Sequence, residues 1–202
     1  MEDKISTVRL DLLKELGNIG MGNALSSLSE MLKDEKIQME VPEVRLVSLG
    51  ELVEEISSLV DDEVAGLYIN VEEEIKLYLV LLFPMDNVLD LVNVLSNEIE
   101  EEKDALGIQA LSEAGNVISA GYLNALSFMM DTVLMPQPPG IFIDLPETVM
   151  SSILAESRIY EDTVIYIKTS LSTKETQIEG YLSVIPGRNA FRKIYNTFLK
   201  GK

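Results

Sequence analysis

The chain has 202 residues, a length that usually folds as one domain or as two small ones. It carries 16 lysines and arginines against 34 aspartates and glutamates, for a net charge of −18, and 47% of its residues are apolar. That apolar share is enough for a hydrophobic core. Histidine and cysteine are both absent, which excludes a Ser-His-Asp triad, a cysteine nucleophile, a phosphohistidine and the usual zinc sites.

The negative charge also argues against binding to nucleic acid or to anionic lipid, because an acidic surface repels polyanions. Residues Met1 to Arg9 are charged and amphipathic and contain no apolar signal core. The longest apolar run, Leu77 to Met85, is too short to span a bilayer. We therefore expect a soluble, cytoplasmic protein that inserts into no membrane.

The first half of the chain predicts helices around an antiparallel hairpin. Apolar residues at a spacing of three and four predict a long helix over Ile5–Lys33. The elements predicted after it are a strand within Lys36–Val47, a short helix at Glu51–Leu59, a hairpin of Val64–Val71 and Lys76–Phe83, and a helix at Asp86–Ser96.

The second half repeats this order after a charged joint at Asn97–Lys103. The elements predicted there are a long helix at Asp104–Asp131, a proline-rich loop, a strand at Ile141–Ile143, a short helix at Pro146–Ser157, a hairpin of Thr163–Leu171 and Gln177–Ile185, and a final helix at Asn189–Leu199. The two long helices also match in sequence, with ELGN from Glu15 recurring 98 positions later as EAGN from Glu113.

These features predict one α+β domain over residues 1–202, made of two repeats at about 1–98 and 103–202. We expect the repeats to be related by a pseudo-twofold axis. Helices and hairpins without parallel crossovers favour an antiparallel sheet with the long helices packed on one face.

A polar stripe about 60° wide is predicted on each long helix, since successive helical residues advance by about 100°. The stripe comprises Asp11, Glu15, Asn18 and Gly22 on the first helix, and Gln109, Glu113, Asn116 and Ala120 on the second. A carboxylate and a carboxamide three residues apart project side by side. Two interpretations stay open at this point: a solvated helix face kept by duplication, or a functional pair presented twice.

Glycines interrupt both helices, namely Gly17, Gly20, Gly22, Gly115 and Gly121. Each costs about 1 kcal/mol of helix stability relative to alanine. Something must therefore approach these backbones closely, and a packed neighbour within the chain is favoured over a ligand or partner protein.

At these residues the sequence resembles the CheC family, with its relatives CheX and FliY, phosphatases of the chemotaxis response regulator CheY. The family pattern is Asp or Ser, three residues, Glu, two residues, Asn, and a later Pro. It reads Asp11, Glu15, Asn18 and Pro42 in the first repeat, and Gln109, Glu113, Asn116 and Pro139 in the second. Gln109 departs from the pattern, and Pro42 is one residue further from its Asn than Pro139 is.

The resemblance implies two catalytic sites, one at Glu15 and Asn18 and one at Glu113 and Asn116, with the other pattern residues in support. It implies that Asn positions a water on the aspartyl phosphate of a CheY-like receiver and that Glu pairs with the receiver's lysine. The protein then needs no cofactor of its own, because the receiver holds Mg²⁺. It also implies that the glycines let the helix approach the receiver, and that the deamidase CheD is a possible second partner.

Two other functions are weighed against this one: an adaptor that binds CheD or a phosphorylated receiver with little turnover, and a structural module of the flagellar switch. The remaining candidates have structural explanations. We expect most tyrosines to lie in the core, and the acidic runs at 61–63, 72–74 and 98–102 to be solvated segments and not metal sites.

Overall fold

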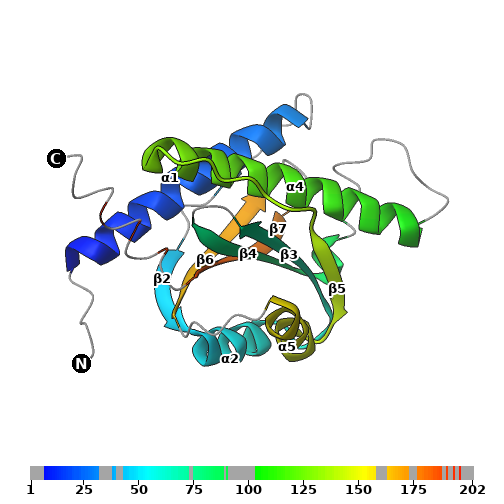
Figure 1. Ribbon diagram of the computed structural model, residues 1–202. Helices are drawn as coiled ribbons and strands as arrows, with labels where there is room; N and C mark the ends of the chain where they lie inside the picture. Colours follow the sequence, from blue (N-terminus) through cyan, green and yellow to red (C-terminus); the bar gives the residue numbers. More distant parts are fainter. Residues whose placement is uncertain are drawn as a thin grey trace.

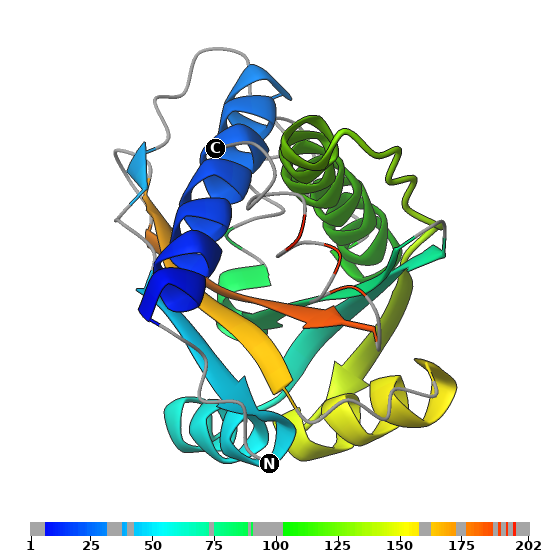
Figure 2. The same cartoon turned by 60° about the vertical axis from the view of Figure 1, so that its left-hand side comes forward.

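The computed structural model describes residues 7–31, 38–39, 43–72, 75–88, 90, 103–157, 163–172, 177–187, 190, 193 and 196. Two long helices, α1 (Thr7–Met31) and α4 (Lys103–Met130), lie side by side on one face of an antiparallel sheet (Figures 1 and 2). Two short helices, α2 (Leu49–Leu59) and α5 (Pro146–Ser157), cover the other face. The predicted α+β class and the packing of the long helices are confirmed, and the short helices add a third layer.

The sheet has seven strands: β1 (Gln38–Met39), β2 (Glu43–Ser48), β3 (Val64–Glu72), β4 (Lys76–Pro84), β5 (Gly140–Asp144), β6 (Thr163–Ser172) and β7 (Gln177–Pro186). Their order is β1-β6-β7-β4-β3-β5, and β2 also pairs with β6. The two predicted hairpins, β3–β4 and β6–β7, therefore meet at the β4–β7 ladder in the middle of the sheet.

The outer strands exchange between the halves of the chain. Strand β2 from the first half pairs with β6, and β5 from the second half pairs with β3. With β2 taken as the strand beside β6 and β1 left out, the order β2-β6-β7-β4-β3-β5 reads the same from either edge when each strand is replaced by its counterpart in the other half. A pseudo-twofold relation of two repeats would give such an order, and the duplication itself stays a prediction.

Two hydrophobic cores follow from the alternation of side chains along the strands. Leu67, Ile69 and Val71 of β3 point toward the long helices, whereas Tyr68 between them points toward the short ones. All four are buried, so the central strands are apolar on both faces. This double burial explains why Leu77–Met85 reads as an uninterrupted apolar run.

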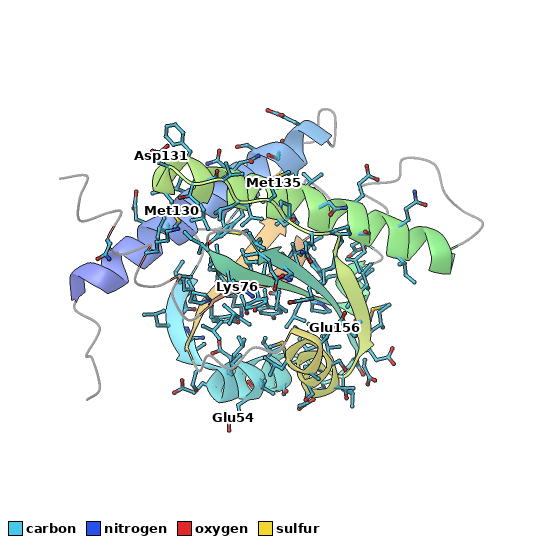
Figure 3. All side chains as sticks on the ribbon, viewed as in Figure 1. Glu54, Lys76, Met130, Asp131, Met135 and Glu156 are labelled. Carbon is cyan, nitrogen blue, oxygen red and sulfur yellow. The ribbon has the colours of Figure 1, made fainter. Side chains whose placement is uncertain are left out.

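The short helices are fixed by local signals and by a cross-link to the sheet. Ser48 caps α2 in a reciprocal capping box with Glu51. Arg45 of β2 forms ion pairs with Glu55 of α2 and, at 3.1 Å, with Glu43. The hydrogen bond that Arg45 donates to the Glu55 carboxylate raises the pKa of the arginine. Glu54 of α2 and Glu156 of α5 are both exposed, and Figure 3 shows Glu54 pointing away from the sheet.

Two predicted helices fall largely outside the described residues. Residues 85–88 and 90 are helical, at the start of the predicted helix Asp86–Ser96, and Ala190, Lys193 and Asn196 are helical within the predicted Asn189–Leu199. Among the helices that the structure describes, none has both the length and the apolar character needed to cross a bilayer.

Candidate functional site

Helix α1 packs on the sheet with the side opposite its polar stripe. Leu16 is buried, and a Cβ on Gly17 would lie 2.9 Å from the side chain of Val44 on β2. Residues 16 and 17 sit more than 100° around the helix from the middle of the stripe. Glu15 and Asn18 are accordingly exposed on the outer surface.

Helix α4 repeats this arrangement on the other half of the sheet. Ala114 is fully buried, and a side chain on Gly115 would overlap Leu67 of β3. Glu113 and Asn116 are exposed beside them, as is Gln109 one turn earlier. Each long helix therefore presents a carboxylate and a carboxamide to solvent, three residues apart.

The helices run in opposite directions where they cross (Figure 1). At the crossing, the backbone of Gly121 lies against that of Ala24, and Gly20 lies against the ring of Tyr122. Asn18 and Asn116 precede this crossing on their own helices, so they lie on opposite sides of it. With a rise of 1.5 Å per residue, they are separated by about 14 Å along the helix axes. The structure thus keeps two separate polar pairs and does not merge them into one site.

The helix glycines serve mainly to pack the protein itself. Gly20 and Gly121 bring the two helices together, and Gly17 and Gly115 seat them on the sheet. The expectation that the glycines let the helix surface approach a receiver is therefore wrong for these four, because their open sides face the chain's own core. Gly22 is different: within the part of the chain that the structure describes, a Cβ there would have no atom within 4 Å.

The supporting pattern residues are placed only in part. Pro42 and the side chain of Asp11 lie outside the described residues. Pro139 is half-buried in the loop between α4 and β5. That loop is joined to β3 through Gln137, whose backbone N–H donates to the carbonyl of Asn70 at 2.9 Å.

The remaining candidates have mostly structural roles. Five tyrosines are buried as predicted, namely Tyr68, Tyr78, Tyr122, Tyr166 and Tyr181, and the other two lie outside the described residues. Burial raises the pKa of Tyr181 to about 12, so this phenol is neutral at physiological pH. Residues 61–63 are exposed, and within the part of the chain that the structure describes no three acidic side chains are grouped to hold a metal ion.

Two surface features were missed by sequence reasoning. A hollow of about 410 Å³ continues the stripe of α1, lined among the described residues by Leu25, Ser26, Ser29 and Glu30. The sequence feature that could have predicted this hollow is the series of small residues Gly22, Ser26 and Ser29 at helical spacing. The second feature is apolar: Phe128 near the end of α4 is 90% exposed, and Val133 and Met135 of the following loop are also exposed (Met135 is labelled in Figure 3).

This geometry limits what each polar pair does chemically. An exposed amide both donates and accepts hydrogen bonds, and an exposed carboxylate accepts them or pairs with a cation. Neither pair includes a strong nucleophile or a buried general base. Each pair is suited to orienting groups in the active site of a bound partner.

Comparisons with known proteins agree with the resemblance to the CheC family. A model of the CheC-like family matches residues 8–45, which include Glu15 and Asn18. The CheY-P phosphatase CheC of Bacillus subtilis is 27% identical over 198 residues, covering 95% of this chain and 94% of that protein.

Solved structures show the same fold. Thermotoga maritima FliY superimposes with a TM-score of 0.78 at 22% identity, covering 98% of this chain and 100% of that one. A chain of the CheX–CheY–BeF3–Mg²⁺ complex of Borrelia burgdorferi matches with a TM-score of 0.53 at 15% identity, covering 92% and 100%. In sequence and in fold, then, this chain is similar to the CheC-like proteins, as the Glu/Asn motif of its two long helices indicates.

Proposed function

We propose that this protein is a phosphatase that accelerates hydrolysis of the aspartyl phosphate of a CheY-like receiver. One observation carries the proposal: both long helices expose a Glu/Asn pair at the same spacing, in a chain similar over nearly its whole length to a CheY-P phosphatase. The match to a chain of a CheX–CheY complex supports a receiver as the partner.

The proposed mechanism needs only positioning. An aspartyl phosphate is an activated acyl phosphate, so catalysis requires a water held in line with the phosphorus. The carboxamides of Asn18 and Asn116 accept a hydrogen bond from that water and donate one to a phosphoryl oxygen. Their exposure on an outer helix face leaves them accessible to the cleft of a docked receiver.

The carboxylates orient the complex. Glu15 and Glu113 pair with the receiver's active-site lysine, which fixes the docked helix and excludes loosely bound water. The Mg²⁺ ion belongs to the receiver, so the chain supplies no metal ligand. The proposal thereby accounts for an enzyme that contains neither histidine nor cysteine.

The test measures loss of phosphate from a phosphorylated CheY-like receiver in the presence of Mg²⁺. The double variant Asn18→Ala/Asn116→Ala should lose the acceleration, by about 100-fold or more, because the water is no longer positioned. Asn23→Ala is a matched control, since this exposed amide lies on the same helix and donates to the carbonyl of Ile19 at 2.9 Å. We expect the control to retain full activity.

Each alternative has its own result. Acceleration that persists in the double variant would show that these asparagines are not the catalytic groups. A wild-type protein that binds CheD or a phosphorylated receiver without accelerating phosphate loss would be an adaptor. The single variants compare the two sites and show whether Gln109 weakens the second.

A further inference from the structure

Among the five glycines of α1 and α4 considered above, Gly22 is the one that packing against the described residues does not explain. The four glycines discussed above would each push a Cβ into a neighbouring residue. At Gly22 a Cβ would meet no atom of the described residues within 4 Å. Since glycine weakens a helix interior relative to alanine, the chain keeps a destabilising residue where alanine would fit.

The position of Gly22 connects it to the first polar pair. It falls at the middle of the stripe, between the directions of Glu15 and Asn18, and about 6 Å beyond Asn18 along the axis. The hollow lined by Leu25, Ser26, Ser29 and Glu30 begins within the next turn. The hydroxyl of Ser26 donates to the carbonyl of Gly22 at 2.9 Å, which holds that side chain against its own helix. From Gly22 onward, therefore, the side chains next to Asn18 on the outer face of α1 are small and protrude little from the helix.

The second helix is bulkier at the corresponding positions, 98 residues later. Ala120 stands for Gly22, Asn124 for Ser26 and Phe128 for Glu30. Both Asn124 and Phe128 are exposed, so their side chains add to the outer surface of α4. The two polar pairs are alike, but the surfaces that follow them differ.

We infer that Gly22 is a positioning residue that lets a protruding backbone loop of the partner rest directly on α1, so that the first site binds its partner more closely than the second. The inference rests on the proposed phosphatase function, and it adds that the two sites differ in how tightly they bind the receiver. A methyl group at residue 22 would hold the partner away and move Asn18 from the phosphorus, while meeting none of the described residues of this chain.

The test uses the Asn116→Ala variant, in which only the first site is active. Adding Gly22→Ala should raise the KM for the phosphorylated receiver by about tenfold, the effect of a single steric conflict at an interface. The same substitution should raise the unfolding midpoint by about 2–4 °C, as expected for a better helix former in a protein of this size. Weaker binding by a more stable protein separates a docking role from a folding role.

Two further variants complete the experiment. Gly50→Ala is the matched control, because a Cβ on Gly50 would likewise meet no described atom within 4 Å, but this glycine lies on α2, across the sheet. It should leave KM unchanged. Ala120→Gly in the Asn18→Ala background should lower the KM of the second site.

The outcomes are distinguishable. An unchanged KM for Gly22→Ala in the Asn116→Ala background, or a lower unfolding midpoint, overturns the inference about Gly22 while leaving the phosphatase intact. Persistent acceleration in Asn18→Ala/Asn116→Ala instead overturns the proposed function.

Discussion

The glycines of α1 and α4 show how differently one residue type is used within a single helix pair. Gly121 faces backbone atoms of Ala24, Gly115 faces the end of the Leu67 side chain, and Gly22 faces none of the residues that the structure describes. A backbone neighbour cannot move without shifting its helix, whereas the end of a leucine rotates at modest cost. Alanine substitution therefore has a different expected effect at each position.

Gly121→Ala should lower the free energy of unfolding by about 3 kcal/mol, because its Cβ would lie 2.6 Å from the Cα of Ala24 and force the helices apart. Gly115→Ala, which displaces only the Leu67 side chain, should cost about 1 kcal/mol. Urea denaturation of both variants gives the comparison. Equal losses would show that the helix crossing yields as easily as the leucine.

At the scale of elements, helix α2 is defined by its N-terminal cap. The Ser48 side chain accepts a hydrogen bond from the N–H of Glu51 at 3.2 Å, and the Glu51 carboxylate accepts one from the N–H of Ser48 at 2.7 Å. The bond from the Ser48 backbone is the main cause that lowers the pKa of Glu51. Both N–H groups would otherwise lack a partner at the start of the helix.

This capping box gives the stability of the protein a pH-dependent part. Since the folded pKa of Glu51 lies below its ordinary value of 4.5, the ionised carboxylate stabilises the fold above that value. The stabilisation is lost as the pH falls through the folded pKa. Glu51→Gln should therefore be less stable than wild type at pH 7, and the difference should shrink below about pH 4. Thermal melts of both proteins between pH 3 and pH 7 measure it; a constant difference would contradict the assignment.

At the scale of the whole molecule, the exchange of outer strands joins the two halves. Strand β2 of the first half pairs with β6, and β5 of the second half pairs with β3. The two hairpins are joined where β4 pairs with β7. The long helices α1 and α4, one from each half, also pack on each other. Neither half buries its apolar surfaces by itself, although each contains a complete set of predicted elements.

Separate fragments 1–98 and 103–202 should therefore not fold as monomers. Each would leave a strand without its partner and one side of its long helix uncovered. Mixing the fragments should restore a 1:1 complex with native secondary structure, measured by circular dichroism and light scattering. A fragment that is monomeric and cooperatively folded alone would show that the halves are independent.

Periodicity and local signals in the amino-acid sequence are enough to predict most of the helices and strands and the residues that face outward. The helix period separated Glu15, Asn18, Glu113 and Asn116 from the buried faces, and the prediction of α5 agrees with the structure at both ends. These features depend on neighbours within a few residues along the chain, so periodicity and capping signals record them.

Which surfaces meet one another is seen only in the folded chain. Periodicity marks a face as apolar without naming what covers it, so neither the position of the short helices on the far face nor the pairing of β2 with β6 could be read from the pattern. The neighbours of the helix glycines could not be predicted either, because a glycine in a sequence does not indicate which residue packs against it. Gly121 differs from Gly22 because it contacts Ala24, a residue about 100 positions away along the chain. Folding alone brings two such distant residues together.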